Sequence, residues 1–255
     1  MNNKLEFTKQ LVLEAGEIIR KMMKESVEVT EKSSHRDLVT NVDKAIEVFL
    51  VENISSKFAD QSFLTEEKTV ETIETDDMWV IDPIDGTSNF IFQSDNFAIS
   101  VALYHKRLPV FGIVYDVMED KLYWGEIGVG AYLNGTQLDN LDQTTELFEV
   151  MITGDVYRPD LFKVSPEELK QLFLTNRYLG SGALETSMVG AGRFGAYVFP
   201  QIKLWDIAAG VIILECVGGT WKFGDHENSV PFDDETRVFI GAQNNRIKDA
   251  LVALL

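Results

Sequence analysis

The sequence predicts an α+β protein whose 255 residues form one domain of two closely joined lobes. Two observations support this fold class. In the front lobe, over about residues 1–140, apolar residues first recur at helical spacing and then form short runs separated by polar turns. In the back lobe, over about residues 141–255, strand-like and helix-like stretches alternate. No low-complexity linker separates the lobes, so we expect them to pack together without a flexible hinge.

The front lobe is expected to begin with two helices. Apolar residues at helical spacing predict the first over about residues 4–24, and a second follows from Val42 to Ile54, after a polar loop at 32–37. A short buried strand at 79–81 then stops at Asp82. The rest of this lobe is predicted to be a meander of strands at 97–104, 110–115, 121–126 and 131–133.

The back lobe is expected to alternate strands with helices. Strands are predicted at 148–152, 178–181, 196–199 and 238–242. One helix opens at Ser165, where a capping box is combined with a proline in the first turn. Further helices are expected near 183–191 and over 205–216 and 246–255.

The charge of the chain limits its partners. Its 41 acidic and 23 basic residues give a net charge of -18, which repels nucleic acid and anionic membranes. The longest apolar run, 207–214, is too short to span a bilayer. Cys216 is the only cysteine, which indicates a reducing compartment, and with no apolar signal core near the N-terminus we expect a cytoplasmic protein. An anionic substrate would also be repelled, unless cations occupy the site.

The segment Asp82–Ser88 has the residues of a metal and phosphate site. Pro83 favours an extended backbone at Asp82, and Asp85 follows closely enough for both carboxylates to face one point. Gly86 allows a sharp turn, after which Thr87 and Ser88 suit a helix start whose free N–H groups can hold a phosphate oxygen. Paired carboxylates beside such a cradle call for hard cations. The alternative is an ordinary turn, because Asp, Pro and Gly are all turn formers.

Four blocks of sequence decide between these readings. One of the four contains this segment, and together they resemble the inositol monophosphatase family, part of a larger group of lithium-sensitive, magnesium-dependent phosphatases that includes fructose-1,6-bisphosphatases and nucleotide phosphatases. The blocks are Asp37–Asp43, Phe63–Glu67, Asp82–Phe90 and Trp205–Gly210. The resemblance implies a sugar-phosphatase fold, a layered αβαβα sandwich. It also implies a phosphoric monoester hydrolase that is inhibited by lithium and forms a homodimer.

The resemblance further implies two to three Mg²⁺ ions in each active site. The first ion would be held by Glu66, Asp82 and the main-chain carbonyl of Ile84. The second would be held by Asp82, Asp85 and Asp206. A third, weaker ion would be bound by Glu66 through waters, near Lys32. Four converging carboxylates repel one another unless cations compensate them, and such cations would also attract an anionic phosphate ester to an acidic protein.

The remaining site residues are also assigned from the resemblance. Thr87 and Glu66 would orient the attacking water, and Asp43 would accept a hydrogen bond from the Thr87 hydroxyl. Water, rather than a side chain, would be the nucleophile, so no phosphoenzyme would form. Phosphate and substrate would be bound by residues of two turns and one strand: Gly86, Thr87, Ser88, Gly180, Ser181, Gly182 and Phe199.

Several of these residues have simpler explanations. Glu66 and Lys32 could be solvated loop charges, and Asp43 a surface residue of its helix. Asp206 could cap the helix that follows it, which is compatible with metal binding. We expect Cys216 to be a small core residue and assign no role to the histidines.

Phe199 departs from the family pattern and leaves the substrate open. Animal inositol monophosphatases carry at this position a glutamate that hydrogen-bonds inositol hydroxyls. An aromatic ring cannot accept those hydrogen bonds, although it can stack on a flat group or point into the core. An inositol phosphate, a sugar bisphosphate such as fructose 1,6-bisphosphate, and NADP(H) or another nucleotide are therefore all candidates.

Two other classes of protein are less consistent with the sequence. A regulatory binding protein of transcription or ribosome assembly would need a basic docking surface but not all four carboxylates. A phosphatase with an aspartate nucleophile needs two aspartates one residue apart after the first strand, whereas Asp82 and Asp85 are three apart in the middle of the chain.

Overall fold

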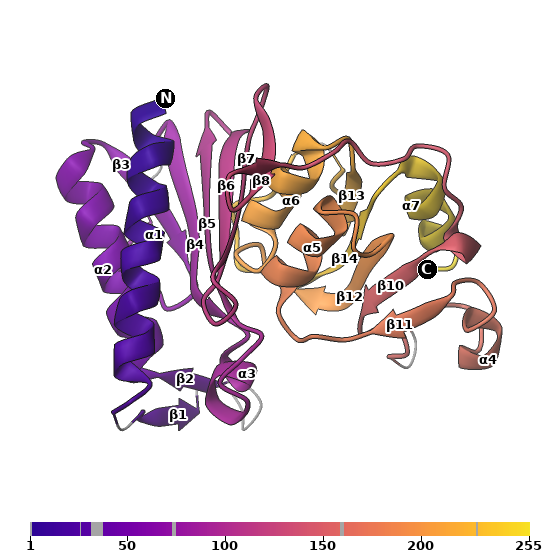
Figure 1. Ribbon diagram of the computed structural model, residues 1–255, viewed down its shortest axis with the longest axis horizontal. Coiled ribbons are helices and arrows are strands. Elements are labelled where there is room, and N and C mark those ends of the chain that lie inside the picture. Colours follow the sequence, from indigo (N-terminus) through magenta and orange to yellow (C-terminus); the bar gives the residue numbers. More distant parts are fainter. Residues whose placement is uncertain (1, 26, 32–37, 73–74, 159–160, 228) are drawn as a thin grey trace.

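The structure, a computed structural model, describes residues 2–25, 27–31, 38–72, 75–158, 161–227 and 229–255. Its elements stack as the predicted αβαβα sandwich (Figure 1). The outer helices of the front lobe are α1 (Asn2–Met22) and α2 (Asn41–Lys57). The central layer consists of α5 (Gly182–Gly190) and α6 (Ala208–Cys216). The far side carries α7 (Asn245–Val252) and the short helices η1 (Leu147–Glu149) and α4 (Pro166–Leu169).

The front sheet lies between α1 and α2 on one side and α5 and α6 on the other. Over the described residues its strand order is β3-β4-β5-β6-β7-β8-β9, with β3 parallel to β4 and the other neighbours antiparallel. Its strands are β3 (Gln61–Thr65), β4 (Asp77–Asp85), β5 (Ala98–His105), β6 (Leu108–Asp116), β7 (Lys121–Glu126), β8 (Gly130–Leu133) and β9 (Thr136–Gln137). The short helix α3 (Thr87–Phe92) follows β4, and a small ribbon of β1 (Val29–Glu31) and β2 (Leu38–Thr40) precedes α2.

The back sheet separates the central helices from α7. In the described part of the chain its order is β11-β10-β12-β14-β13, with parallel pairing of β10 to both β11 and β12. Its strands are β10 (Met151–Gly154), β11 (Thr175–Arg177), β12 (Ala196–Ile202), β13 (Thr220–Phe223) and β14 (Arg237–Ala242).

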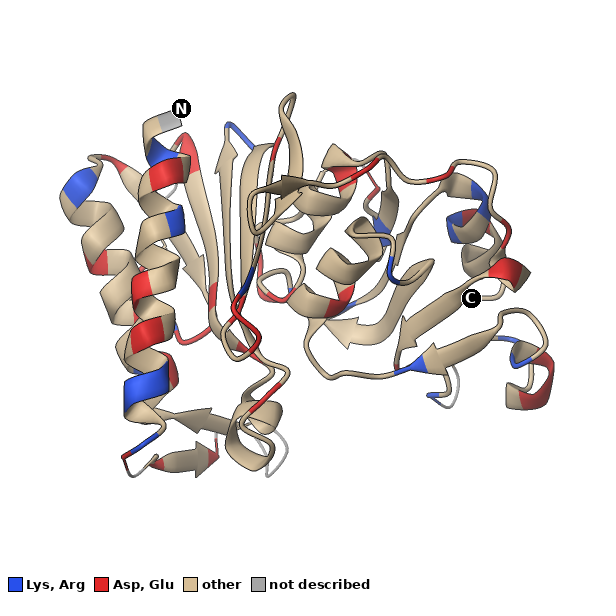
Figure 2. Ribbon diagram, in the orientation of Figure 1, with Lys and Arg blue, Asp and Glu red and all other residues tan. Residues whose placement is uncertain are grey.

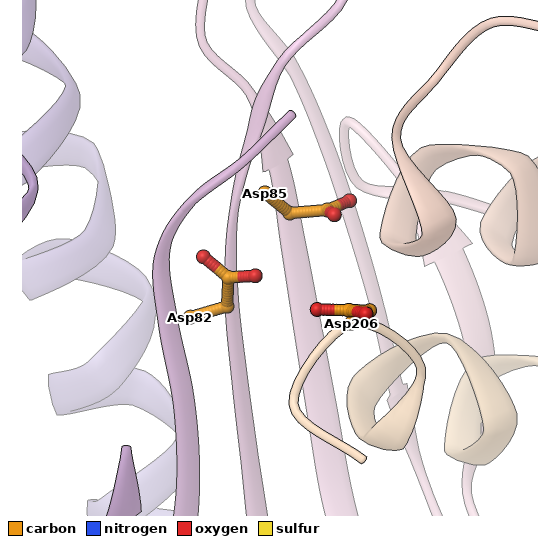
Figure 3. A group of neighbouring side chains, drawn as sticks. All are labelled: Asp82, Asp85 and Asp206. Carbon is orange, nitrogen blue, oxygen red and sulfur yellow. The ribbon is translucent and has the colours of Figure 1, made fainter. Parts of the chain in front are cut away.

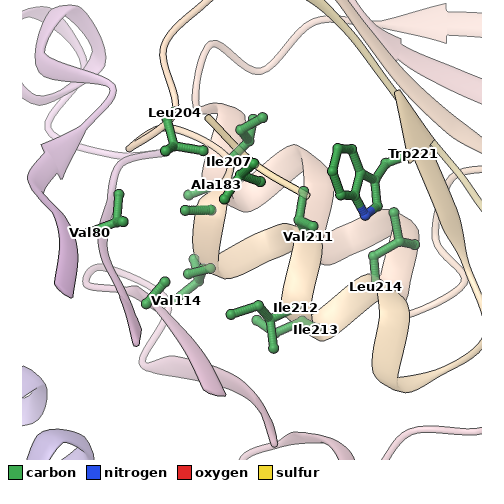
Figure 4. Packing of buried hydrophobic residues seen from close by; sticks show 14 of the residues in the cluster. Val80, Val114, Ala183, Leu204, Ile207, Val211, Ile212, Ile213, Leu214 and Trp221 are labelled. Atoms are coloured by element: carbon green, nitrogen blue, oxygen red, sulfur yellow. The ribbon is translucent and has the colours of Figure 1, made fainter. Parts of the chain in front are cut away.

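Apolar cores fill the spaces between these layers. Buried residues of α1 and α2 pack on one face of the front sheet, and α7 packs on the outer face of the back sheet. In the central core, Val80 and Val114 of the front sheet face Ala183, Ile207 and other apolar residues of the α5–α6 layer (Figure 4). The front sheet thereby meets the back lobe across a largely apolar interface.

Some predicted elements were wrong in type or extent. Residues 178–181 form a loop rather than a strand, because Gly180 has a φ of +86° and this segment's N–H groups bond to a side chain. Residues 147–149 form a 3-10 turn, and the strand begins only at Met151. The helix predicted from 205 starts at Ala208. The strands that were not predicted are β1, β2, β3, β9, β11 and β13. The loop at 32–37 lies outside the described residues.

The charges follow the composition. Acidic residues occur on the helices and loops of both lobes, with fewer basic ones among them (Figure 2). Among the residues described, no helix is both long enough and apolar enough to cross a membrane.

Candidate metal and phosphate site

The parallel pairing of β3 with β4 brings the first two acidic residues together. Thr65 is in register with Ile81, so the residues that follow them, Glu66 and Asp82, lie at the same end of the two strands. The main-chain N–H of Glu66 donates to the carbonyl of Ile81 at 3.3 Å, which extends the ladder by one bond. The Glu66 and Asp82 carboxyl groups are close enough to interact directly.

A β-bulge aligns Asp82 with Asp85. Side chains three residues apart in a regular strand point to opposite faces. Here Asp82 pairs with Ser100 and Asp85 with Ala98, so three steps on β4 match two on β5. The extra residue turns both aspartates toward the same side. Strand β4 therefore continues through Pro83 to Asp85. The sequence had predicted that it would end at Asp82.

Asp206 completes the cluster from the opposite lobe. It lies just before α6, whose N-cap is Ile207, so the alternative role of Asp206 as the cap of that helix is not observed. Its Oδ2 instead accepts the Lys203 N–H at 3.0 Å. One carboxylate oxygen each from Asp82, Asp85 and Asp206 lie within 4.8 Å of one another, and the three groups converge on a common space (Figure 3).

This crowding changes the acidity of the carboxyl groups. Burial, followed by the charges of Glu66, Asp85 and Asp206, raises the pKa of Asp82 well above its usual range. Burial and then the charges of Asp85 and Glu66 likewise raise the pKa of Asp206. Burial raises the pKa of Asp85 to about 7, although hydrogen bonds from the neighbouring loop oppose the shift. With a pKa of about 7, Asp85 is about half protonated near neutral pH when no cation is bound.

A loop of the back lobe holds Asp85 in place. Ser181 Oγ and the Ala183 N–H donate to Asp85 Oδ2 at 2.5 Å and 2.7 Å. Ser181 also caps α5, because its hydroxyl accepts the Leu184 N–H at 3.3 Å. Ser181 and Gly182 are buried behind the carboxylates, and a Cβ on Gly182 would lie 3.2 Å from Asp206 Cβ.

Thr87 and Asp43 are brought together although they are far apart in the sequence. Thr87 Oγ1 lies 3.3 Å from Asp43 Oδ1 and 3.2 Å from the Ile84 carbonyl oxygen, so its hydroxyl can donate to either. Asp43 is buried, and it also forms the capping box of α2 with Thr40. Its other oxygen accepts the Thr40 N–H and hydroxyl, at 2.9 Å and 2.5 Å.

A pocket of about 470 Å³ opens beside this cluster. Its lining comes from β2, the loop after β3, helix α3 with the turn before it, and the loop at 178–180. The turn needs glycine at Gly86, where φ is +97° and a Cβ would lie 3.2 Å from the Asn96 carbonyl oxygen. The lining residues are Leu38, Glu66, Gly86, Thr87, Ser88, Asn89, Gln93, Tyr178, Leu179 and Gly180.

Phe199 lies behind the rim of this pocket. It is half-buried and is not among the lining residues. Its ring centroid is 5.9 Å from that of Tyr178 and 6.1 Å from that of the buried Tyr197. Tyr178, which is 57% exposed, therefore presents its ring to the pocket with Phe199 as support.

Sequence reasoning missed the residues that fix the loop at 178–181. Asn89 Nδ2 donates to the carbonyls of Leu179 and Asn96, at 2.7 Å and 2.8 Å. The buried Glu185 accepts the N–H groups of Leu179 and Gly180, at 3.2 Å and 3.1 Å. Both side chains act on main-chain groups, which sequence patterns reveal only in known motifs. Lys32 lies outside the described residues.

The donor set fits a divalent cation. Carboxylate and carbonyl oxygens are the ligands that Mg²⁺ and Ca²⁺ prefer, and buried like charges need compensation. The three clustered aspartates meet this description, with Glu66 beside them.

Comparison with known proteins agrees with this chemistry. The family model described as the inositol monophosphatase family matches residues 1–255. The inositol-1-monophosphatase of Bacillus subtilis (strain 168) is 37% identical over 221 residues, covering 85% of this chain and 83% of that protein. The solved IMPase of Thermotoga maritima has a TM-score of 0.86 at 30% identity, covering 98% and 96%. A solved IMPase/NADP phosphatase complexed with Mg²⁺ and phosphate has a TM-score of 0.85 at 26% identity, covering 99% and 93%.

Proposed function

The chain belongs to the inositol monophosphatase family and is a phosphoric monoester hydrolase, and we propose that it uses Mg²⁺ to release phosphate from a small soluble ester resembling inositol 1-phosphate. The observation that carries this proposal is the cluster of Asp82, Asp85 and Asp206 with Glu66 beside it. Placing the three aspartates, with their raised pKa values, so close together is costly, and a cation-binding role accounts for that cost.

The proposed ligands are those assigned to the first two ions in the sequence analysis. Glu66, Asp82 and the Ile84 carbonyl would hold one ion, and Asp82, Asp85 and Asp206 the other. A third ion beside Glu66 is part of the same proposal. When bound, Mg²⁺ would lower the pKa of a water molecule and offset the charge of the phosphate oxygens.

The chain's own groups would position the reactants. Thr87 can donate its hydroxyl to Asp43, which leaves the Thr87 oxygen free to accept a hydrogen bond from an attacking water. Glu66, which lines the pocket, would accept a second hydrogen bond from that water. The turn at Gly86–Ser88 would bind phosphate oxygens, with Gly180 directly beside the turn, where a Cβ on Gly86 would lie 3.3 Å from the Gly180 carbonyl oxygen. Ser181 and Gly182 would act through Asp85 and Asp206 rather than by touching substrate.

One observation supports a second candidate substrate. The exposed Tyr178 ring on the pocket, supported by Phe199, is suited to stacking on a flat heterocycle. It favours NADP(H) or another nucleotide as a substrate in addition to, or in place of, a cyclitol phosphate. Among the residues that the structure describes, no corresponding feature favours fructose 1,6-bisphosphate.

The test is a panel of phosphate-release assays with Mg²⁺, on inositol 1-phosphate, fructose 1,6-bisphosphate and NADP. Release from at least one ester, abolished by EDTA and restored by Mg²⁺, is expected. The ranking of kcat/KM then identifies the substrate. Phosphate release that persists unchanged in EDTA would contradict the metal-dependent mechanism, and inactivity on every ester would favour a regulatory binding role.

Three further properties belong to the same proposal. We expect lithium to inhibit turnover, because a small cation can occupy a Mg²⁺ site. We expect a homodimer, which light scattering of the purified protein would detect. A cytoplasmic location and the absence of a nucleic-acid partner are supported by the net charge of -18 and the single cysteine.

A further inference from the structure

A fully buried carboxylate, Glu47, lies on α2 beneath the loop that follows β3. It accepts four hydrogen bonds, one from the last residue of β3 and three from that loop. Glu47 Oε2 accepts the Glu67 N–H at 2.7 Å. Glu47 Oε1 accepts the Thr65 hydroxyl at 2.9 Å, and the Thr69 N–H and hydroxyl at 2.8 Å each. This network does not enter the mechanism described above.

The four donors lie on both sides of Glu66, one of the residues of the acidic cluster. Thr65 precedes it, and Glu67 and Thr69 follow it. The N–H of Glu66 itself is bonded to Ile81 in the sheet. The backbone around Glu66 is therefore fixed by β4 on one side and by Glu47 on the other.

A carboxylate at position 47 has a specific advantage over an amide. The N–H groups of Glu67 and Thr69 donate to different oxygens of Glu47 and cannot act as acceptors. A glutamine has one acceptor oxygen, so one of these N–H groups would face an NH₂ group in either orientation. A residue that only filled space would not need two acceptor atoms directed at the loop.

We propose that Glu47 is a positioning residue that orients the Glu66 carboxylate for cation binding. The inference rests on the proposed function. Asp43 lies one helical turn earlier on α2 and contacts Thr87, so this helix would position residues on two sides of the site. Glu47 would hold a metal ligand in place without touching the metal. Loss of such a side chain typically weakens metal binding although every ligand is still present.

The experiment compares Glu47→Gln with Glu52→Gln by calorimetric titration of each metal-free protein with Mg²⁺. Glu52 is an exposed residue of the same helix, so its variant makes the same charge change away from the loop. We expect Glu47→Gln to weaken Mg²⁺ binding roughly 10- to 100-fold. The Glu52 variant should bind like the wild type. Equal affinities for all three proteins would overturn the positioning role but not the proposed function, whereas a wild type that bound no Mg²⁺ would overturn both.

A second pair of variants covers the possibility that Glu47→Gln folds poorly. Thr69→Val removes one hydroxyl donor to Glu47, and Thr69→Ser retains it. We expect a severalfold loss of Mg²⁺ affinity in the valine variant and near wild-type affinity in the serine variant. At saturating Mg²⁺, kcat should recover in the valine variant and the substrate KM should stay unchanged. A kcat that stays low at every Mg²⁺ concentration, or equal losses in both variants, would indicate a purely structural role and overturn the proposal.

Discussion

Ser181 donates its hydroxyl to Asp85 Oδ2 at 2.5 Å, and this bond joins the back lobe to the acidic end of β4. The same serine caps α5, so the start of that helix and the orientation of a carboxylate depend on one side chain. Asp206 reaches the cluster from the loop before α6. The acidic cluster is thus assembled by the packing of two lobes, and neither lobe contains it alone.

The first prediction concerns Ser181→Ala. The variant leaves Asp85 with one oriented donor fewer and α5 without its cap. We expect Mg²⁺ affinity to fall roughly 10-fold or more. We also expect the free energy of unfolding to fall by about 1 kcal/mol. Calorimetric titration and urea unfolding measure the two effects separately.

Ser187→Ala is the matched control for this prediction. Ser187 is a buried serine of the same helix whose hydroxyl has no hydrogen-bond partner among the described residues. Its removal should leave both Mg²⁺ affinity and stability near the wild-type values. Equal losses of affinity in the two variants would show that the Ser181–Asp85 bond has no particular role.

The second prediction concerns pH. Asp85 has an ordinary pKa of 3.8, which the fold raises to about 7. Between these values the unfolded chain has lost a proton that the folded protein keeps, so stability of the metal-free protein should fall as pH rises from about 4 to about 7. Mg²⁺ needs the ionised form, so its affinity should rise over the same interval. Its binding at about pH 6 should release close to one proton or more per site.

Proton release can be measured by titrating Mg²⁺ in two buffers with different heats of ionisation. If Asp85 alone contributes, the number of protons released should fall toward zero as the pH is raised to about 9. If Asp82 and Asp206 also bind protons, more protons should still be released at that pH. Binding at pH 6 without any proton release would contradict the raised pKa values.

The third prediction concerns the Thr87 hydroxyl. Thr87→Val keeps the shape of the side chain but cannot donate to Asp43 or accept from a water. We expect kcat to fall by about 10²- to 10⁴-fold, the usual contribution of an oriented proton-transfer group. Mg²⁺ affinity should change little. Thr87→Ser, which keeps the hydroxyl, should retain most activity; equal inactivity of both variants would point instead to a packing role for the methyl group.

The parts of the site that are formed by neighbouring residues could be predicted from the sequence, whereas the parts that depend on pairing between distant segments could not. Asp82, Asp85 and Gly86 form a local pattern, so sequence alone indicated their chemistry. The bulge that aligns the two aspartates depends on pairing with β5, and a sequence pattern does not contain that register. The segment 178–181 was predicted to be a strand but forms a loop. Its N–H groups donate to Glu185, a residue of the following helix, and the sequence pattern does not reveal that acceptor.

The fold was predicted best where periodicity was long or turns were distinctive. Helix α1 and the meander from β5 to β8 have such patterns, and Asn134 and Gly135 adopt the positive φ values that their turn needs. Strand β3 was missed because only two of its five residues, Phe63 and Leu64, are apolar, although four of the five are buried. The layer order itself came from the family resemblance rather than from residue patterns.

The fourth prediction tests the packing between the lobes. Gly112 of β6 lies against α6, where a Cβ would come within 2.3 Å of the Ala209 carbonyl oxygen. Gly112→Ala should therefore push the helix from the sheet and lower the free energy of unfolding by about 1–3 kcal/mol or more. Gly125→Ala, whose Cβ would lie 3.0 Å from Ile213 Cα, should cost less. Urea unfolding of both variants checks this order, and a larger loss at Gly125 would contradict it.

The fifth prediction concerns substrate choice at the pocket rim. Tyr178 keeps its ring in place against Phe199, which in turn contacts Tyr197, so stacking on a substrate would immobilise little that is not already ordered. Aromatic pairs of this kind contribute about 0.5–1.5 kcal/mol, or roughly 2- to 13-fold in affinity. Tyr178→Ala should raise the KM for NADP by about that factor and leave kcat and the KM for inositol 1-phosphate nearly unchanged.

The control for this prediction is Tyr157→Ala, at a partly exposed tyrosine that does not line this pocket. Equal KM changes for both substrates would mean that Tyr178 shapes the pocket without selecting a flat ring, and the nucleotide would lose its support as a substrate.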